Sequence, residues 1–154
     1  LLTDELIGTI SLEDYCRPWP ESPPSPRLKR SIIEKVARIT RQLHENGVNH
    51  RDLYICHFLM KEASAKPDAT PEDIELFIID LHRVQIRNRT PRRWIVKDVA
   101  GLYFSSMDIG LTTRDRLRFM RHYRSRPLRE QFNRESSFWR TVERKALQLY
   151  RKST

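Results

Sequence analysis

The segment from residue 27 to residue 47 constrains the fold more than any other part of this sequence. Its apolar residues recur at spacings of one, three and four, which places them on a single face of an α-helix. They are Ile32, Ile33, Val36, Ile39 and Leu43. Asn46-Gly47 provides a stop, because glycine readily takes the left-handed conformation that ends helices. The pattern predicts an amphipathic helix over residues 27–46, whose apolar face must be buried against the rest of the chain.

Directly after this helix, the sequence predicts a tight loop and a pair of strands. The loop carries His50-Arg51-Asp52, and strand-forming residues follow at 54–60 and again at 74–79. The second strand runs straight into Asp80. Residues 61–73 form a long connection, so the two strands are expected to make a hairpin. We expect the carboxylates of Asp52 and Asp80 to face a common cleft.

This order of elements suits phosphoryl transfer. The reaction needs a positioned acceptor hydroxyl and cations that neutralise charge on the transferred phosphoryl group. Two carboxylates at one end of a hairpin can divide these tasks. His-Arg-Asp alone recurs by chance, and a hydrophilic turn is the alternative interpretation. The preceding helix, the five-residue step from Asp52 to His57 and the strand ending in Asp80 make the combination more specific.

The rest of the chain is expected to pack around this hairpin as a single domain. Residues 1–16 end in a short helix capped by Ser11. Residues 17–26 contain five prolines and predict a surface loop. Residues 27–154 form the main body, and the fold class is α+β, mostly helical. Three further helices are predicted at about 94–106, 113–125 and 128–151.

The charge balance indicates anionic partners. Lys and Arg number 29 against 20 Asp and Glu, a net charge of +9. This excess favours nucleic acid, a phospholipid surface or a phosphorylated substrate without choosing among them. The two cysteines lie far apart, so free thiols in a reducing compartment are expected. No apolar stretch approaches the roughly 20 residues that span a bilayer, and the first residues lack the pattern of a signal peptide. We therefore expect a cytosolic protein that can sit on a membrane surface.

Three longer strings resemble a known family. The strings "NHRDLYICHFLM", "IIDLHR" and "TPRRWIVKDVAGLYFSSMDIGLTTRDRLRFMRHY" look like the lipopolysaccharide core heptose kinases of Gram-negative bacteria, over about residues 1–125. The resemblance implies the C-terminal lobe of a protein-kinase-like fold, with the hairpin at its catalytic loop. It implies ATP-dependent phosphorylation of the first heptose of the lipopolysaccharide inner core. The acceptor would be the lipid A-core glycolipid, reached by peripheral contact at the cytoplasmic face of the inner membrane.

The resemblance assigns roles residue by residue. Asp52 resembles the catalytic base, and His50 and Arg51 support its loop. Asp80 resembles the aspartate that binds Mg²⁺ on the nucleotide phosphates. His57 lies where protein kinases have a metal-binding Asn. Imidazole is a softer ligand than a carboxamide oxygen for Mg²⁺, so a metal role for His57, direct or indirect, stays open, while ATP and Mg²⁺ are the implied cofactors.

The resemblance also places Asp4, Glu5 and Leu6 at the nucleotide-binding hinge between the two lobes of a kinase. The chain has only four glycines and no glycine-rich loop to cover a nucleotide. We therefore expect a C-terminal lobe over residues 27–154 without its N-terminal lobe. By itself it would bind ATP poorly and be inactive.

The basic residues after Asp80 are candidates for binding the acceptor. Guanidinium groups match carboxylates and phosphates, and the resemblance places the acceptor beside this segment. An anionic glycolipid is therefore expected to contact Arg83, Arg87, Arg92 and Arg93. The alternative is a solvated loop.

Other functions stay open at this point. They are a kinase of another sugar such as Kdo, a catalytically silent kinase-like scaffold, and a nucleic-acid-binding module that uses residues 112–126 as a groove-entering helix. That helix has apolar residues suited to packing, so no nucleic acid is expected. Acidic acyl carrier protein is a possible partner, from the resemblance and the net charge of +9.

A zinc site lacks the ligand spacing that such sites require. The side chains that would form it are His50, Cys56, His57 and His82. Cys56 stands in an apolar run and is expected to be a small buried residue. The three tryptophans, Trp19, Trp94 and Trp139, are expected to be packing residues.

Overall fold

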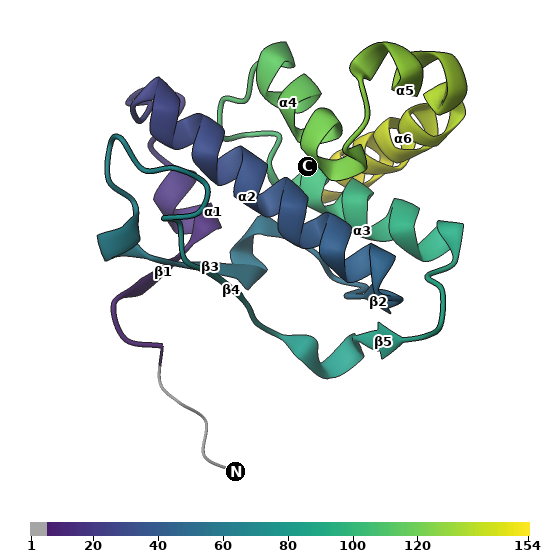
Figure 1. Cartoon of the computed structure of the whole chain (residues 1–154), viewed down its shortest axis with the longest axis horizontal. Helices are drawn as coiled ribbons and strands as arrows, with labels where there is room; N and C mark the ends of the chain where they lie inside the picture. The colour runs from purple at the N-terminus through teal and green to yellow at the C-terminus, as the bar shows by residue number, and fades with distance from the viewer. Residues whose placement is uncertain (1–5) are drawn as a thin grey trace.

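The long amphipathic helix forms as predicted, in a computed structural model that describes residues 6–154 (Figure 1). This helix, α2, spans Pro26–Glu45. The Ser25 hydroxyl caps its start by accepting a hydrogen bond from the backbone N–H of Leu28 at 3.2 Å, and Pro26 stands in the first turn, where its missing N–H has no helical partner to lose. Gly47 ends the segment with a φ of 77°. The buried face of α2 includes most of the predicted stripe, together with Thr40 and His44.

Three short strands make an antiparallel sheet in the order β1-β3-β4. The strands are β1 (Thr9–Ser11), β3 (Phe58–Lys61) and β4 (Leu76–Ile78). The predicted hairpin is confirmed by the pairing of β3 with β4. The predicted strand over 54–60 is wrong in its first half, because Ile55–His57 form a 3-10 turn whose amide at His57 bonds back to the carbonyl of Tyr54. Strand β1 was not predicted, and it has only three residues.

A second, two-stranded ribbon brings distant segments together beside the first sheet. Its strands are β2 (Val48–Asn49) and β5 (Gln85–Ile86). The ribbon continues through a hydrogen bond from the amide of Arg87 to the carbonyl of Gly47 at 2.9 Å. A Cβ atom at Gly47 would lie 1.7 Å from the carbonyl oxygen of Arg87, so only glycine allows this approach. The ribbon therefore places the residues after Asp80 alongside the His50-Arg51-Asp52 loop.

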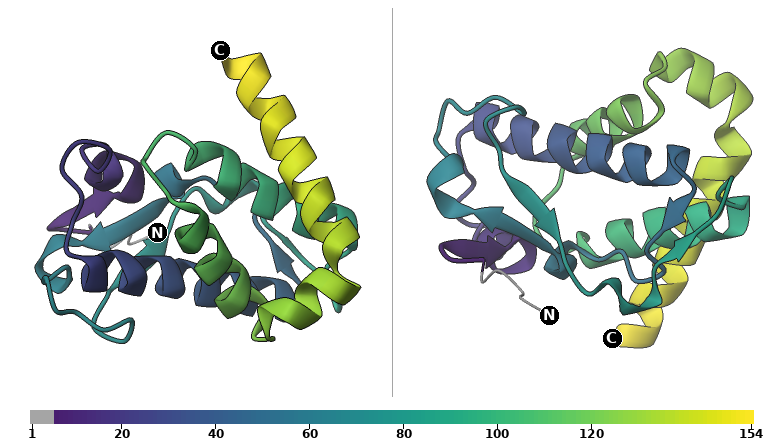
Figure 2. Two further views of the ribbon diagram at one scale, coloured as in Figure 1. Left: turned by 90° about the horizontal axis from the view of Figure 1, so that it is seen from above. Right: turned by 60° about the horizontal axis from the view of Figure 1, so that its bottom comes forward.

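The C-terminal half is helical. Its elements are α3 (Arg92–Ser105), α4 (Thr113–Arg124), α5 (Leu128–Arg134) and α6 (Ser136–Ser153). α4 packs against α2 and α6 packs against α3, with α5 turning the chain between them (Figure 2). The single helix predicted over 128–151 is wrong: it breaks at Glu135, whose φ of −119° leaves the helical region. The break lets α6 bury Phe138 and Val142 against α3 while α5 stays beside α4. Within residues 6–154, no helix is both long and apolar enough to cross a membrane.

The short helix α1 (Leu12–Cys16) forms as predicted, with the Ser11 hydroxyl accepting from the backbone N–H of Asp14 at 3.1 Å. α1 lies near the sheet, and its residues Leu12 and Cys16 are buried. The expectation for Cys56 is wrong, because its side chain is only half-buried at the 3-10 turn. Both thiols are free, and burial raises the pKa of Cys16 to about 12.

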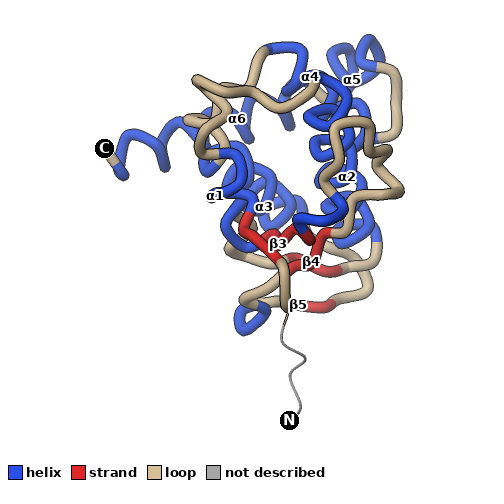
Figure 3. The backbone as a smooth tube through the Cα atoms, turned by 90° about the vertical axis from the view of Figure 1, so that its left-hand side faces the viewer, coloured by secondary structure: helices blue, strands red, loops and turns tan. Residues whose placement is uncertain are grey.

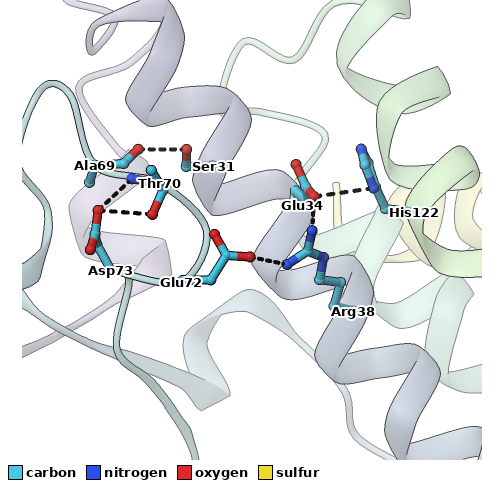
Figure 4. A network of polar contacts seen from close by, with 8 residues as sticks. All are labelled: Ser31, Glu34, Arg38, Ala69, Thr70, Glu72, Asp73 and His122. Carbon is cyan, nitrogen blue, oxygen red and sulfur yellow. Dashed lines mark hydrogen bonds and ion pairs between the residues drawn. The ribbon is translucent and has the colours of Figure 1, made fainter.

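The long connection before β4 is anchored to α2 (Figure 4). The Ser31 hydroxyl donates to the carbonyl of Ala69 at 2.7 Å. Arg38 donates to the carboxylate of Glu72 at 2.7 Å, and it also pairs with Glu34 one turn earlier on the helix. Glu34 in turn faces His122 of α4. One helix thus ties together the connection and α4.

The core has two parts that meet along α2. One lies between α1, α2 and the sheet, and the other lies between α2, α3, α4 and α6. The same four helices, with α1, surround an apolar cavity of about 430 Å³. In the tube trace of Figure 3, α2, α3 and α4 lie above the short strands, which are drawn in red. Residues along the cavity wall include Leu102, Ile109, Phe119 and Trp139.

Candidate active site

The His50-Arg51-Asp52 loop is fixed by a buried carboxylate. Asp98 of α3 is fully buried, and its two oxygens accept hydrogen bonds from the backbone N–H groups of His50 and Arg51, each at 2.8 Å. Arg51 has a φ of 77°, which a non-glycine residue rarely adopts. The loop therefore keeps an unfavourable backbone conformation because Asp98 holds both of its amides.

Asp98 is a residue that sequence reasoning missed. The signal for it was present: it is an acid within the apolar segment "WIVKDVAGLYF", on a helix whose neighbouring residues Val96 and Val99 are buried. A buried carboxylate needs hydrogen-bond donors. Its partners come from residues about 50 positions away, so no local pattern identified them.

Two further side chains stand behind Asp98. His44 at the end of α2 places Nε2 at 3.0 Å from Asp98, and its Nδ1 lies 2.6 Å from the hydroxyl of Tyr123 in α4. Because a carboxylate only accepts, the His44 Nε2–H donates to it and Nδ1 is left to accept from Tyr123. Burial raises the pKa of Tyr123, so its phenol stays protonated and remains a donor. The chain Tyr123–His44–Asp98 thus connects α4 with the loop.

The carboxylate of Asp52 is paired with an arginine. Nη1 of Arg83 donates to both oxygens of Asp52, at 2.9 Å each. The Asp52 side chain is 17% exposed, so the pair lies at the surface end of the loop. Arg83 is one of the arginines predicted to contact an acceptor, and in the structure it pairs with the candidate base.

His57 connects the two aspartates. Its Nδ1 donates to the backbone carbonyl of Asp52 at 2.7 Å, and its Nε2 faces the carboxylate of Asp80 at 3.2 Å. Asp80 has a φ of 61° and lies two residues after the end of β4, and its second oxygen contacts His82. Asp52 and Asp80 therefore lie at the same end of the sheet, on either side of one imidazole.

The donor set around Asp80 determines what kind of metal site it can make. Among residues 6–154, no group of three or more His, Cys, Asp or Glu side chains is placed to hold a metal ion without other ligands. Mg²⁺ commonly binds through one or two carboxylates together with substrate phosphates and water. Asp80 fits a site in which one carboxylate shares Mg²⁺ with substrate phosphates and water, and His57 lies beside it.

The remaining candidates fall in different places. Arg87 and Arg93 lie close to the indole of Trp94, whereas Arg92 reaches toward α6 and stacks over Phe138, away from these two arginines.

Of the expected hinge residues, Asp4 and Glu5 lie outside the described part of the chain. Leu6 is partly exposed, and its carbonyl accepts a hydrogen bond from the hydroxyl of Thr9. The loop is supported at His50 by a hydrogen bond from Nε2 to the carbonyl of Ile79 at 2.9 Å.

The chain has a mostly helical α+β fold of the kind found in the C-terminal lobe of protein-kinase-like proteins. The features that define it are a helix, a His-Arg-Asp loop held by a buried aspartate, a hairpin and a second aspartate. The model of the lipopolysaccharide kinase (Kdo/WaaP) family matches residues 1–123. The chain therefore belongs to the lipopolysaccharide kinase (Kdo/WaaP) family.

Relatives with assigned functions agree with the family. The lipopolysaccharide core heptose(I) kinase WaaP of Pseudomonas aeruginosa is 52% identical over 150 residues, which are 97% of this chain and 55% of that protein. The enzyme of the same name from Escherichia coli K12 is 49% identical over 147 residues, 95% of this chain and 54% of that protein. A solved structure of WaaP in complex with acyl carrier protein matches with a TM-score of 0.84 and 53% identity, covering 95% of this chain and 59% of that one. The chain thus spans about half the length of the relatives it matches.

Proposed function

We propose that this chain contains the catalytic loop and the metal-binding aspartate of a kinase that transfers phosphate from ATP to the first heptose of the lipopolysaccharide inner core. The observation that carries the proposal is the bridge made by His57, which contacts the Asp52 loop with one nitrogen and the Asp80 carboxylate with the other. Phosphoryl transfer needs an acceptor site and a metal–nucleotide site next to each other. The names of the relatives supply the substrate class.

In this proposal Asp52 accepts the proton of the attacking heptose hydroxyl. Arg83 holds the Asp52 carboxylate through both oxygens, so it fixes the direction in which the base faces. Asp80 would hold Mg²⁺ on the nucleotide phosphates, where such an ion would supply positive charge to neutralise the transferred phosphoryl group. His57 orients both the loop and Asp80, because it contacts each of them with one ring nitrogen. Since Nδ1 is used by the Asp52 carbonyl, only Nε2 can face a metal.

The test is a kinase assay on a protein of the relatives' full length that carries this sequence, with purified lipopolysaccharide acceptor. Asp52→Asn should lower turnover by about 10²–10⁴-fold, the usual contribution of a general base, and leave Mg²⁺-dependent nucleotide binding intact. Asp80→Asn should weaken nucleotide binding as well as turnover. Asp68→Asn, at an exposed acid in the connection before β4, is the control and should behave as wild type. Near-wild-type turnover of Asp52→Asn would remove it from catalysis, and transfer to Kdo in place of heptose would change the acceptor sugar.

We place the kinase at the cytoplasmic face of the inner membrane, in peripheral contact with it. The acceptor class is a glycolipid, and the net charge of +9 favours an anionic lipid surface. Sedimentation with anionic vesicles tests this, and the bound fraction should fall as ionic strength rises. Equal binding to neutral vesicles would contradict an electrostatic contact.

Acyl carrier protein is a proposed partner. A similar protein was solved in complex with it, and an acidic carrier protein complements the positive charge of this chain. The apolar cavity of about 430 Å³ among α2, α3, α4 and α6 has suitable chemistry for an acyl chain. Pull-down with acylated carrier protein should succeed, and it should weaken when basic surface residues are reversed in charge. A pull-down unaffected by charge reversal would count against the electrostatic contact.

A further inference from the structure

Four basic side chains surround a single indole next to the candidate catalytic loop. Measured from guanidinium carbon or ammonium nitrogen to the ring centroid of Trp94, the separations are 4.9 Å for Arg51, 5.2 Å for Arg93, 5.7 Å for Lys97 and 6.0 Å for Arg87. We call these four residues with Trp94 the Trp94 cluster. Trp94 was expected to be a packing residue, and its ring instead supports cations contributed by the loop, the segment after β5 and α3.

No acidic side chain in the described part of the chain pairs with the positive charges of the cluster. Among the residues that the structure describes, none of its four basic side chains forms an ion pair. Arg87 donates to the side chain of Gln85 at 2.9 Å. Nε of Arg51 and Nε1 of Trp94 are buried and have no hydrogen-bond partner in the described part of the chain. Buried donors of this kind are normally satisfied, by protein, water or a ligand.

The four positive charges around the indole repel one another. Burial lowers the pKa of Lys97, and the neighbouring charges of Arg83 and Arg51 lower it further, while Asp52 acts in the opposite direction. Lys97 is therefore within electrostatic reach of both the candidate base and its arginine. A bound anion would relieve this repulsion by accepting hydrogen bonds from the guanidinium and ammonium groups of the cluster.

The position of the cluster indicates which anion it takes. Arg51 is the residue before Asp52, so the cluster adjoins the proposed base, whereas the proposed nucleotide metal lies beyond His57 at Asp80. Guanidinium groups bind carboxylates and phosphates with paired hydrogen bonds, and an aromatic face packs well against a sugar or a cation. A group bound here would be attached to the molecule whose hydroxyl reaches Asp52.

We propose that the Trp94 cluster is a subsite for an acidic group, carboxylate or phosphate, carried on the saccharide of the acceptor next to the hydroxyl that is phosphorylated. This inference rests on the proposed kinase function. The cluster selects acceptors by charge, and it adds Arg51, Lys97 and Trp94 to the arginines expected from the sequence. Arg92 is excluded from it, because its guanidinium lies over Phe138.

Binding to the ¹⁵N-labelled chain tests the subsite without requiring catalysis. The probe is lipopolysaccharide core oligosaccharide with its acyl chains removed, and the readout is the indole N–H signal of Trp94, assigned with Trp94→Phe. The oligosaccharide should shift this signal and leave those of Trp19 and Trp139 in place. Oligosaccharide whose carboxyl groups have been reduced to alcohols and whose phosphates have been removed should bind about tenfold to a hundredfold more weakly, as expected for lost charge-assisted hydrogen bonds.

A matched pair of double variants separates local contact from overall charge. Arg87→Gln with Arg93→Gln removes two charges from the cluster, and Arg151→Gln with Lys152→Gln removes two from the exposed end of α6. The first pair should weaken oligosaccharide binding at least about tenfold, and the second should change it less than about twofold. Equal effects of the two pairs, or no shift of Trp94, would overturn the subsite.

Two further outcomes are distinguished. Anionic phospholipid vesicles that shift Trp94 while the oligosaccharide does not would assign the cluster to membrane lipid and overturn the proposal. Inorganic phosphate alone should bind more weakly than the oligosaccharide, and equal affinity would mean that no saccharide is recognised. Failure of the kinase proposal is recognised separately, because it is decided by the turnover of Asp52→Asn and not by the Trp94 signal.

Discussion

The carboxylate of Asp98 accepts a hydrogen bond at 2.8 Å from the backbone N–H of Arg51, a residue 47 positions earlier in the chain. Arg51 has a φ of 77°. A left-handed conformation costs a non-glycine residue about 1–2 kcal/mol, and the hydrogen bonds of a buried carboxylate can offset that cost. The backbone that leads into the neighbouring Asp52 is therefore positioned by α3.

Asp98→Asn should destabilise the chain strongly. Asn keeps one acceptor oxygen but turns an amide NH₂ toward donors that need an acceptor, namely the backbone N–H groups of the loop and Nε2–H of His44. We expect the free energy of unfolding to fall by about 3–5 kcal/mol, because several hydrogen bonds to a charged group, each about 1.5–3 kcal/mol, are lost or weakened. Urea denaturation measures it, with the exposed Asp68→Asn as control. A loss below about 1 kcal/mol would show that the carboxylate does not hold the loop.

Tyr123→Phe should loosen the loop from a distance. The substitution removes the hydroxyl that donates to Nδ1 of His44, and leaves that nitrogen buried without a donor. We expect a loss of about 1–3 kcal/mol in the free energy of unfolding, together with faster hydrogen exchange at the amides of His50 and Arg51. Tyr150→Phe is the matched control, because it removes a hydroxyl that bonds to Asp108 at the surface. If the two variants exchange at the same rate at both amides, Tyr123 has no influence on the loop.

The sequence was sufficient for features that depend on local pattern. The stripe of α2, the hairpin and the cap at Ser11 follow from periodicity and side-chain chemistry within a few residues. The order of motifs then led to Asp52 and Asp80, which the fold brings to one end of the sheet.

Features that depend on distant partners did not follow from the sequence. β1 is only three residues long and exists because β3 offers it an edge. The break at Glu135 serves the packing of α6 on α3, which no periodicity within residues 128–151 reveals. The role of Asp98, the position of Arg92 away from the other arginines, and the Trp94 cluster likewise depend on which helices meet.

Gly47→Ala should be far more damaging than Gly8→Ala. Both glycines have positive φ, 77° and 72°, so both variants bear the left-handed cost of about 1–2 kcal/mol. Only at Gly47 would the new Cβ meet another atom, at 1.7 Å from the carbonyl oxygen of Arg87, while nothing lies within 4 Å at Gly8. Denaturation of both variants should show that the free energy of unfolding falls by several kcal/mol more in Gly47→Ala than in Gly8→Ala. Equal losses would mean that β5 can move away freely.

Arg83→Gln should lower turnover while scarcely changing stability. The ion pair with Asp52 is partly exposed, with side-chain exposures of 42% and 17%, and such pairs add about 0–1 kcal/mol to folding. Turnover should fall about tenfold to a hundredfold in a full-length kinase, because the base loses the donor that directs it. Arg17→Gln, which breaks an exposed pair with Asp14, is the control. Faster turnover in Arg83→Gln would show instead that the arginine blocks the base.

Asp115→Asn should give a pH-dependent loss of stability. Burial by itself would raise the pKa of Asp115, but hydrogen bonds from Lys29, at 2.7 Å, and from the backbone of Thr112 outweigh it and hold that pKa below its usual range. A carboxyl whose pKa is lowered by folding stabilises the native state above its unfolded pKa of about 4. This contribution disappears as the pH falls through the lower, native value.

Asp115 forms a capping box with Thr112 at the start of α4. The difference in unfolding free energy between wild type and Asp115→Asn should therefore be largest near neutral pH, at about 1–2 kcal/mol for the loss of this cap. It should shrink progressively below about pH 4, where the unfolded wild-type chain begins to take up the proton. Urea denaturation at pH 7, 5, 3.5 and 2.5 measures the trend, and the difference between variants cancels the other titrating groups. Asp68→Asn should show a small, nearly constant difference across the same range. A difference for Asp115→Asn that stays constant down to pH 2.5 would mean that the cap does not depend on the charge of the carboxylate.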